Sequence, residues 1–296
     1  MKRKVLFIIN PVSGGKKKDQ VPDLIHESLD INLFELTIVF TTGAMHASEL
    51  ALNAVGQYDY VIAVGGDGTV NEIASSIVGT DTALGIIPFG SGNGLARFLG
   101  IPMDTRKAIQ TLNMQRVEAI DSATLNGQYF FNMAGMGFDA HISEVFSHDK
   151  TRGFGAYIRS AFREIVNYKS ENYHLEIDGV VYDSEAFMLS FANSSQYGNN
   201  AHVSPHASVQ DGLIDVCIIK QFPLYRFPEM GLRMFTKTAE GSKYVKIIRG
   251  RNILVKRSKS GPLHLDGEPQ ISGTDAEIKV IPNSLKIITG RDFKEN

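Results

Sequence analysis

The stretch Gly65-Gly66-Asp67-Gly68-Thr69-Val70-Asn71-Glu72 decides how this chain is interpreted, because strand, turn and helix signals meet in it. An apolar run at 60–64 precedes it, and a segment of mixed helix character follows at 73–78. This order predicts a strand–loop–helix unit. Glycines let backbone amides approach a phosphate that a Cβ would hold off. A pure phosphate cradle would usually avoid the charge of Asp67, so the stretch indicates metal-assisted phosphate chemistry.

Length and composition set broad limits on function. The 296 residues suffice for two domains or one large one, and a net charge of −2 predicts no nucleic-acid partner. No apolar run approaches the roughly 20 residues that a membrane-spanning helix needs. The run Val5–Ile9 stops at Asn10-Pro11 and is interpreted as a buried strand, not a signal peptide. The single Cys217 excludes an intramolecular disulfide framework and fits a reducing cytoplasm.

Strand and helix signals alternate in the first half of the chain. We expect strands at 5–9, 33–41, 60–64 and 84–89, with helices at about 44–55, after the Gly65 loop, before Leu99 and at 104–114. This alternation predicts an α/β domain with a parallel sheet. Ligands of such sheets bind outside the carboxyl ends of the strands, so the loops that follow these strands should converge.

The second half is dominated by strand signals from Val117 onward, with hairpin turns at Asn126-Gly127 and Asp178-Gly179. Only the segment 152–168 is predicted as a helix. Many short strands indicate a β-sandwich or barrel, and we place the boundary near 121–126, which gives domains of 1–125 and 126–284. The predicted strands lie at 173–177, 186–192, 213–220, 245–248, 252–256, 263–265, 276–281 and 284–289.

Two further loops of the first domain are candidates for nucleotide contact. The segment Asn10–Lys16 is either a plain turn or a nucleotide-binding loop, and it lacks the spacing of a P-loop. The run Lys16–Lys18 is expected to be a solvated face, although one lysine could reach a phosphate. The loop Gly90–Gly94 offers the Ser91 hydroxyl, the Asn93 amide and backbone donors.

A candidate ion pair lies near this last loop. Arg97 is either solvated or turned back toward the loop from the first turn of a helix. Asp121 is either a turn residue or its partner near the site.

Two turns of the second domain carry carboxylates. Ser208–Asp215 is a turn entering a strand, and its oxygen atoms could also bind a hard cation. Asp266 and Glu268 flank a glycine directly after a strand. A surface turn is the plain interpretation, and a general base for a hydroxyl nucleophile is the functional one.

Together these motifs resemble the diacylglycerol kinase catalytic-domain family, which includes sphingosine kinases and soluble bacterial lipid kinases. The resemblance covers nearly the whole chain, and it rests on five motifs in order. It implies an α/β nucleotide domain followed by a β-sandwich domain, with the last strand, around 285–289, returning to the first domain; residues 285–296 would then belong there. The motifs are Asn10-Pro-x-Ser-Gly14, Gly65-Gly-Asp-Gly-Thr-x-Asn-Glu72, Pro88-x-Gly-Ser-Gly-Asn93, Asp211-Gly-x-x-Asp215 and Asp266-Gly-Glu268.

The resemblance also implies roles for particular residues. Glu268 would accept the proton of a lipid hydroxyl, with Asp67 near the transferred phosphate and Asp266 in the same catalytic group. Either Asp67 or Glu268 could be the base. A structural Mg²⁺ would be held by Ser208, Asp211 and Leu213. ATP would be contacted by Asn10, Pro11, Val12, Ser13, Gly14, Thr41, Gly66, Asp67, Gly68, Thr69, Val70, Asn71, Glu72, Ser91, Gly92 and Asn93.

One departure from the family bears on the acceptor. Many bacterial diacylglycerol kinases of the family have a Gly-Thr-x-Asn-Asp loop, whereas this chain has Gly90-Ser91-Gly92-Asn93-Gly94 and lacks the acidic residue. The Ser-Gly-Asn form resembles the sphingosine and ceramide kinase branch. Diacylglycerol, a sphingoid base, ceramide and other lipid alcohols all stay open, and a carboxylate such as Asp139 could recognise a sphingoid amine.

Membrane access has a candidate in the segment 233–259, which carries nine basic residues and the single acid Glu240. With nearby aromatic residues it is either a face for an anionic bilayer or a solvated basic face. We therefore expect a cytoplasmic protein that visits the inner membrane surface, and an exposed sandwich edge could form a homodimer. The basic residues are Arg233, Lys237, Lys243, Lys246, Arg249, Arg251, Lys256, Arg257 and Lys259.

The prediction is an ATP- and Mg²⁺-dependent kinase that phosphorylates a lipid hydroxyl. An NAD kinase is the enzymatic alternative, because it shares a Gly-Gly-Asp-Gly loop and a β-rich second domain. A nucleotide- or lipid-binding regulator on the same fold is the non-enzymatic alternative.

Overall fold

A computed structural model describes residues 2–15, 17–148, 163–165 and 168–294. Contacts divide the chain into two compact units, Met1–Ile120 with Asn283–Glu295, and Asp121–Pro282. The predicted helix at 152–168 falls almost entirely outside the described residues. No helix in the described part of the chain combines the length and the apolar character needed to cross a membrane.

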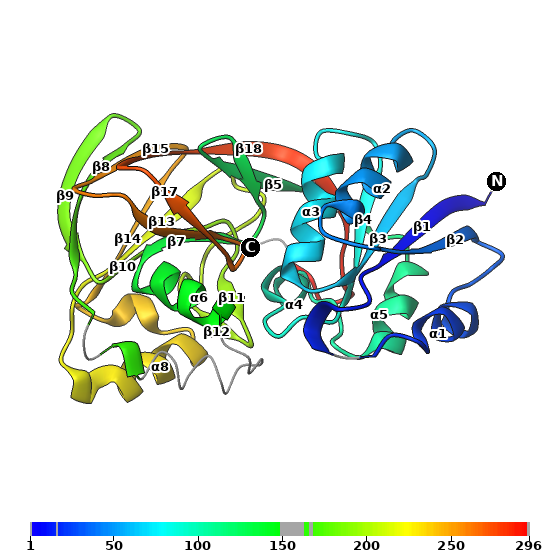
Figure 1. The fold of residues 1–296 in the computed structure, drawn as a ribbon, viewed down its shortest axis with the longest axis horizontal. Helices are drawn as coiled ribbons and strands as arrows, with labels where there is room; N and C mark the ends of the chain where they lie inside the picture. The colour runs from blue at the N-terminus through cyan, green and yellow to red at the C-terminus, as the bar shows by residue number, and fades with distance from the viewer. Residues whose placement is uncertain (1, 16, 149–162, 166–167, 295–296) are drawn as a thin grey trace. The chain divides into compact units, whose positions relative to one another are not determined.

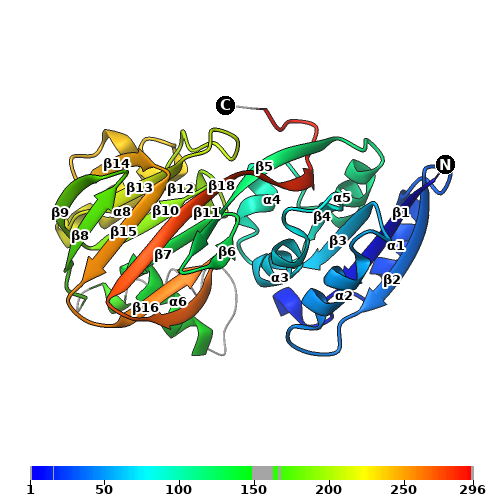
Figure 2. The same cartoon turned by 90° about the horizontal axis from the view of Figure 1, so that it is seen from above.

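The first unit is built on a parallel sheet, as the alternation of strands and helices predicts. Its strand order is β2-β1-β3-β4, and the end of β18 adds a further parallel strand beside β4, where Ile287 is paired with Leu84 (Figure 2). The return of the last strand to this sheet is therefore confirmed. The strands are β1 (Arg3–Ile9), β2 (Phe34–Phe40), β3 (Tyr60–Gly65), β4 (Ala83–Pro88) and β18 (Asp275–Ile288).

Helices cover both faces of this sheet, so β3 and β4 are buried throughout. Helices α2 and α3 pack together on one face, and α1 and α5 pack together on the other (Figure 1). Helix α5 begins where the Asp104 carboxylate accepts a hydrogen bond from the Lys107 amide, which caps its first turn. The helices are α1 (Val21–Ser28), α2 (His46–Ala54), α3 (Asp67–Ile77), α4 (Gly94–Phe98) and α5 (Thr105–Leu112), with the 3₁₀ turn η1 at Ser13–Gly15.

The second unit is a β-sandwich, as predicted. One layer contains β5, β6, β8, β9, β15 and the first part of β18, and the other has the order β14-β13-β10-β7-β16-β17. The strands not yet bounded are β5 (Val117–Leu125), β6 (Gln128–Phe130), β7 (Met133–Gly137), β8 (Glu171–Ile177), β9 (Val180–Ala186), β10 (Met188–Ala192), β13 (Ile214–Ile219), β14 (Val245–Gly250), β15 (Asn252–Arg257), β16 (Gly261–Leu265) and β17 (Glu268–Ser272).

Shorter elements complete this unit. A small separate sheet pairs β11 with β12. These elements are α6 (Phe138–His148), β11 (Gln196–Gly198), β12 (Ala201–His202), η2 (Leu224–Arg226), α8 (Phe227–Phe235) and η3 (Ala239–Gly241).

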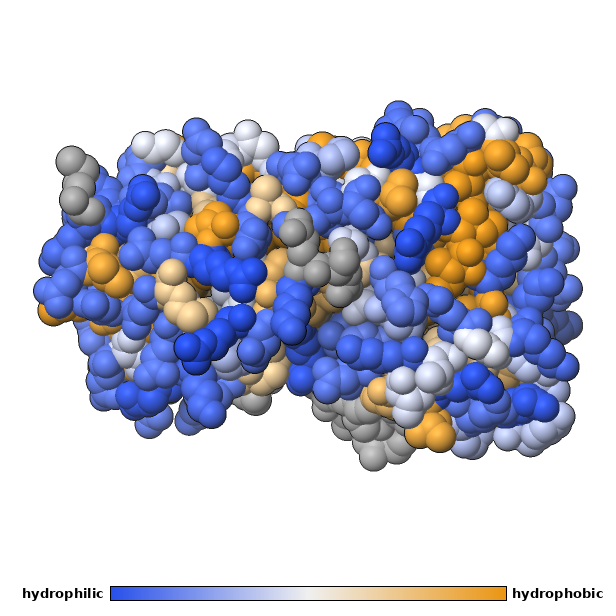
Figure 3. Space-filling view, turned by 180° about the vertical axis from the view of Figure 1, so that it is seen from behind, coloured by the Kyte–Doolittle hydropathy of each residue, from blue (hydrophilic) through white to orange (hydrophobic). Residues whose placement is uncertain are grey.

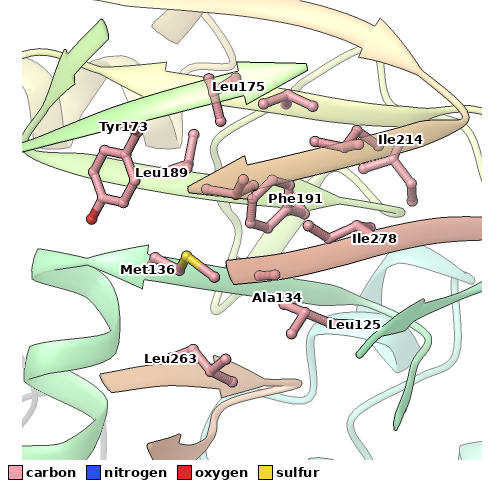
Figure 4. Packing of buried hydrophobic residues seen from close by; sticks show 14 of the residues in the cluster. Leu125, Ala134, Met136, Tyr173, Leu175, Leu189, Phe191, Ile214, Leu263 and Ile278 are labelled. Carbon is pink, nitrogen blue, oxygen red and sulfur yellow. The ribbon is translucent and has the colours of Figure 1, made fainter. Parts of the chain in front are cut away.

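The core of the second unit lies between the two layers. Strand β15 alternates exposed and buried residues, which places Ile253 and Val255 inward, and Tyr173 and Leu175 of β8 face the same interior. Phe191 of β10 reaches this core from the other layer (Figure 4). The period of two in the sequence thus produces a continuous apolar interior.

Several predicted elements differ from the structure, and helices α1 and α6 and strand β9 were not predicted. The strands predicted at 276–281 and 284–289 are one strand, β18, although Pro282-Asn283 resembles a turn; Asn283 has a φ of 50°, and the strand continues beyond it. Helix α8 was not predicted, because Pro228 and Gly231 argue against a helix. Pro228 lies in the first turn, where a missing N–H costs little.

We expect Phe191→Ala to lower the free energy of unfolding by about 3–5 kcal/mol, because it removes a fully buried ring from the sandwich core. The chain has no tryptophan, so urea unfolding is followed by circular dichroism. Val181→Ala, at a side chain 53% exposed, is the matched control and should change stability by less than about 0.5 kcal/mol. Equal losses in the two variants would contradict this assignment of the core.

Candidate functional site

Three loops of the first unit meet where β1, β3 and β4 end. We call the loop after β1 the first loop, the loop after β3 the second and the loop after β4 the third. The Asn10 side-chain amide donates a hydrogen bond to Thr69 Oγ1 at 2.9 Å, which joins the first loop to α3. The Phe89 amide donates to the Gly65 carbonyl at 2.7 Å, which joins the loops after β3 and β4. The edge at which the loops were expected to converge therefore carries one connected cluster.

Close approach of the backbones explains two of the glycines in this cluster. A Cβ on Gly14 would lie 1.6 Å from the Phe89 carbonyl oxygen, and Gly14 has a φ of +65°. A Cβ on Gly66 would lie 3.1 Å from the Gly90 Cα. A side chain at Gly14 would separate the first loop from the third, so glycine is required there.

Asp67 connects the second loop to the third. Its carboxylate accepts hydrogen bonds from the amides of Asn93 at 3.0 Å and Gly94 at 3.1 Å. Gly94 is the first residue of α4, so the carboxylate lies at a helix N-terminus, where negative charge is favoured. Asp67 itself begins α3, which places a second helix N-terminus in the cluster. In this geometry Asp67 holds the loop after β4 against the loop after β3.

Asn93 fixes the third loop from within. It is buried with a φ of 50°, a left-handed conformation that asparagine tolerates. Its side chain accepts from the Gly90 amide at 2.8 Å and donates to the Gly90 carbonyl at 2.7 Å. The loop is therefore held in one shape by its own side chain, while Ser91 at its tip is exposed.

Lys18 is an unexpected part of the first loop. The expectation of a solvated face is wrong for this residue, which is only 3% exposed, and Lys16 lies outside the described residues. Its ammonium group donates to the Ser13 carbonyl at 2.6 Å and lies 4.9 Å from the centroid of the Phe89 ring. It thereby ties the first loop to the end of β4.

The other predicted nucleotide residues surround this cluster. Thr41 is buried, and its amide donates to the Ile9 carbonyl at the end of β1. Val12 is 83% exposed at the tip of the first loop. Arg97 turns back toward its loop and donates from Nε to the Gly92 carbonyl at 3.1 Å. Pro11 is exposed, whereas Gly68, Val70, Asn71 and Glu72 belong to the first turns of α3.

Asp121 belongs to the second unit, where it holds the turn predicted to bind Mg²⁺. It is fully buried, accepts from the Gly212 amide at 2.7 Å, and donates its own amide to the Val209 carbonyl at 2.6 Å. Asp121 therefore shapes this turn, and its pairing with Arg97 stays a prediction.

The turn at 208–213 offers hard oxygen donors. Ser208 Oγ accepts from the Gln210 amide at 3.2 Å, and the Asp211 carboxylate accepts from the Leu213 amide at 3.0 Å. Burial raises the pKa of Asp211 above its ordinary value. Hydroxyl, carboxylate and carbonyl oxygens suit Mg²⁺ or Ca²⁺. Asp211 supplies the one carboxylate of the set Ser208, Asp211 and Leu213. The described residues contain no group of three or more His, Cys, Asp or Glu side chains that could hold a metal.

Asp215, the second aspartate of the Asp211-Gly-x-x-Asp215 motif, interacts with side chains of the protein itself. Asp215 is buried and accepts from Ser204 Oγ at 2.5 Å and from Arg249 Nε at 3.0 Å. Burial raises the pKa of Asp215, and its contacts with Ser204 and Arg249 oppose that effect. The contact between Asp215 and Arg249 joins β13 to β14.

Asp266 and Glu268 occupy very different environments. The Asp266 carboxylate accepts from three backbone amides, those of Phe131 at 3.0 Å and of Asn132 and Met133 at 2.9 Å each. Glu268 begins β17 and is exposed, and its carboxylate has no hydrogen bond or ion pair to any residue that the structure describes. Asp266 thus fixes the turn, and Glu268 is the exposed carboxylate of the two.

A buried His264–Asp139 pair supports the same turn, and sequence reasoning missed it. His264 Nε2 lies 2.6 Å from Asp139 Oδ2, with the two side chains 3% and 5% exposed, and the Gly267 amide lies 3.4 Å from His264 Nδ1. A Cβ on Gly135 would lie 2.6 Å from both side chains, so only glycine fits beside the pair. The expectation that Asp139 could recognise a sphingoid amine is wrong, because this carboxylate is buried against His264.

The charge of His264 follows from two opposing effects. Burial lowers its pKa, whereas attraction to Asp139 and Asp266 raises it, and the net pKa is raised above 6.5. Protonated His264 therefore adds stability that is complete below pH 6.5 and is lost as the pH rises through its folded pKa.

We expect His264→Gln to cost more free energy of unfolding at about pH 6 than at a pH above the folded pKa of His264, because only the protonated histidine forms the ion pair. Urea unfolding at the two pH values measures the difference. His174→Gln is the control, because the contact of His174 with Asp183 at 2.7 Å lies on the surface and should contribute little. A cost independent of pH would contradict an ion pair.

Comparisons with known proteins agree with this architecture. Residues 4–125 match the family model described as the diacylglycerol kinase catalytic domain, and residues 132–289 match the YegS C-terminal NAD kinase beta sandwich-like domain. The chain is 29% identical to a diacylglycerol kinase of Bacillus subtilis over 272 residues, which covers 90% of each chain. It is 31% identical to a Chromohalobacter salexigens protein named "Probable lipid kinase YegS-like", over 71% of this chain and 69% of that one.

Solved structures share the fold. A structure titled as a diacylglycerol kinase from Bacillus anthracis superposes with a TM-score of 0.77 at 22% identity, over 99% of this chain and 98% of that one. An NAD kinase from Archaeoglobus fulgidus in complex with ATP gives a TM-score of 0.54 at 14% identity, over 98% and 95%. The chain is therefore a member of the diacylglycerol kinase catalytic-domain family, a family of phosphotransferases.

Proposed function

We propose that this protein transfers the γ-phosphate of ATP to the hydroxyl group of a lipid, with Mg²⁺ as the metal. The observation that carries the proposal is the loop cluster of the first unit. Its glycines bring three backbones into contact, and Asp67 and Asn93 hold the third loop rigidly against the second. Phosphoryl transfer depends mainly on positioning and on charge stabilisation, which such a preorganised cluster suits.

Glu268 is the base that we propose for the acceptor hydroxyl. A general base must reach the proton that it removes, and this carboxylate is exposed at the start of β17. The three amides on Asp266 and the buried His264–Asp139 pair fix the turn that carries it. Asp67 would lie near the transferred phosphate, and Asp266 would act as a positioning residue.

Mg²⁺ is proposed in two places. Ser208, Asp211 and Leu213 would hold a structural ion with side-chain and main-chain oxygens, in the turn that Asp121 shapes. At the reacting phosphate, the ion would neutralise developing charge. The cytoplasm supplies ATP and the inner membrane surface the lipid, so we place the enzyme there.

We expect purified protein to incorporate labelled phosphate from ATP into a lipid alcohol in the presence of Mg²⁺. Glu268→Gln should lower kcat by at least about 100-fold, the usual size of general-base catalysis, and Asp67→Ala should abolish transfer. The control Glu185→Gln alters another exposed carboxylate of the second unit and should retain activity. Circular dichroism verifies that each variant is folded.

The acceptor panel decides between the alternatives. Diacylglycerol, sphingosine, ceramide and NAD are offered in parallel. Label in NAD but in no lipid would replace the proposal with an NAD kinase, for which the fold similarity to the Archaeoglobus fulgidus enzyme is the supporting observation. ATP binding with no transfer to any acceptor would indicate a regulator, and full activity of Glu268→Gln would refute its role as base.

A further inference from the structure

Hydrophilic residues cover most of the face shown in Figure 3, so a buried ionisable side chain is an exception that needs a reason. Arg257 is one exception. It is buried and donates to four backbone carbonyls, so the expectation of a basic face is wrong for this member of 233–259. Its guanidinium stays charged and has a single role. The buried His264 differs, because an imidazole exchanges a proton near neutral pH and can face two groups at once.

The two ring nitrogens of His264 face different groups. Nε2 lies 2.6 Å from Asp139 Oδ2, and Nδ1 accepts a long hydrogen bond from the Gly267 amide at 3.4 Å. The ring has little room to turn, because a Cβ on Gly135 would lie only 2.6 Å from Nε2. A backbone amide can only donate, so this arrangement fits a neutral ring with its proton on Nε2 and none on Nδ1.

The amide that contacts Nδ1 belongs to the turn that leads into Glu268. Leu265 is paired with Glu268, so Asp266 and Gly267 form a two-residue hairpin turn, with φ values of 48° and 88°. The amides of residues 131–133 hold the Asp266 side chain, whereas His264 holds the Gly267 amide. The peptide plane before Gly267 is rigid, so its rotation would change the direction in which the chain enters Glu268.

A second proton on the ring would remove the contact with the turn. Both nitrogens of an imidazolium are donors, so two N–H groups would then face each other between His264 and Gly267. Burial lowers the pKa of His264, attraction to Asp139 and Asp266 raises it, and the net pKa is above 6.5. The contact with the turn is therefore present above the folded pKa and is lost as the pH falls through it. Falling pH thus strengthens the ion pair and releases the turn.

Helix α6 and strand β11 present two titratable groups to the ring within the described residues. Asp139 of α6 is in direct contact, whereas His141 of the same helix contacts Glu164 instead. Tyr197 of β11 has its ring centroid 6.4 Å from that of His264. Burial and the nearby charge of Asp139 raise the pKa of Tyr197 well above its ordinary value, so this hydroxyl stays neutral.

The neighbouring strands add one further charge. Strand β7 presents Gly135 opposite His264 and strand β17 presents Pro269, and neither residue can titrate. Asp266, in the turn of the same hairpin, adds attraction. Glu268 is exposed and neighbours Pro269 on β17, so its side chain lies on the other face of that strand. Asp139, the carboxylate in contact with Nε2, is therefore the charge to remove in a test.

We propose that His264 is a positioning residue for Glu268, and that its unprotonated Nδ1 holds the turn where catalysis needs it. The proposal rests on the proposed function, in which Glu268 takes the proton of the acceptor hydroxyl. A base must lie within hydrogen-bond reach of the proton that it removes, so a released turn makes it less effective. Activity should therefore fall as the pH drops through the folded pKa of His264.

The first test compares the pH profile of kcat for the wild type and for Asp139→Asn, with ATP and a lipid alcohol both saturating. The variant keeps the ring and an oxygen that accepts from Nε2, but it removes the charge that raises the pKa of His264. The pH at which kcat is half its maximum should therefore be lower by at least about one unit in the variant. Equal midpoints in the two proteins would overturn the proposal.

His264→Gln separates positioning from a purely structural role. Glutamine offers an N–H for Asp139 but no acceptor at the place of Nδ1, and it cannot be protonated. Above the folded pKa of His264, kcat should fall about tenfold while the KM for ATP stays unchanged, and the loss should shrink at lower pH. The matched control His174→Gln should keep the wild-type profile. A loss of kcat that is the same at every pH would indicate a structural role only.

Nuclear magnetic resonance of protein labelled with ¹⁵N-glycine tests the contact without any activity. The Gly267 amide signal is assigned by its absence from Gly267→Asn, since asparagine tolerates a positive φ. This signal should titrate with the same midpoint as the ring of His264, and Asp139→Asn should move both midpoints together. An amide signal that does not follow the ring would overturn the proposal, even if His264→Gln fails to fold.

The two measurements also separate this proposal from the proposed function. If the wild type phosphorylates no lipid but Gly267 and His264 titrate together, the kinase function fails and the proton-dependent turn stands. If the wild type phosphorylates lipid and neither Asp139→Asn nor His264→Gln changes the shape of its pH profile, the positioning role fails and the kinase stands.

Discussion

The loop cluster of the first unit depends on the hydrogen bonds that the Asp67 carboxylate accepts. By accepting the amides of Asn93 and Gly94, it joins the loop after β3 to the loop after β4 and places the start of α4 beside the start of α3. The close approach of Gly66 to Gly90 accompanies this contact and the Phe89–Gly65 hydrogen bond. Gly14, which approaches Phe89, lies in the loop that Asn10 and Lys18 connect to the other two. Without the carboxylate, the amides at the start of α4 would lose their acceptor, and the third loop its orientation.

The same device recurs in the second unit. The Asp121 carboxylate accepts a hydrogen bond from the Gly212 amide and shapes the turn at 208–213. The Asp266 carboxylate accepts hydrogen bonds from three amides and shapes the turn before Glu268. A carboxylate that accepts several backbone amides holds a loop more firmly than one neutral side chain can, because charge-assisted bonds are stronger. Asp67 and Asp266, which sequence motifs mark for chemistry, and Asp121, which no motif contains, thus each organise a loop.

Sequence reasoning predicted what local patterns control and missed what distant contacts control. The strand–loop–helix order of the first unit followed from its strand, turn and helix signals, and the β-sandwich of the second followed from many short strand runs with turn signals. The meeting of the loops followed from the rule for parallel sheets. The burial of Lys18 depends on Phe89, and the Asp139–His264 pair joins α6 to β16. Neither contact leaves a signal in its own stretch of sequence. Helix α8 was missed because Pro228 and Gly231, which lie within it, are unfavourable in most helix positions.

Amide hydrogen exchange with and without ATP and Mg²⁺ tests most directly whether the three interlocked loops are the nucleotide phosphate site. The account predicts that ATP slows exchange mainly in peptides that contain residues 10–15, 65–72 and 90–94. It predicts a smaller effect of the same nucleotide on the Asp67→Ala variant, because the third loop is then no longer held by the second. Protection that is absent from these loops in the wild type, or located elsewhere in the first unit, would contradict the account.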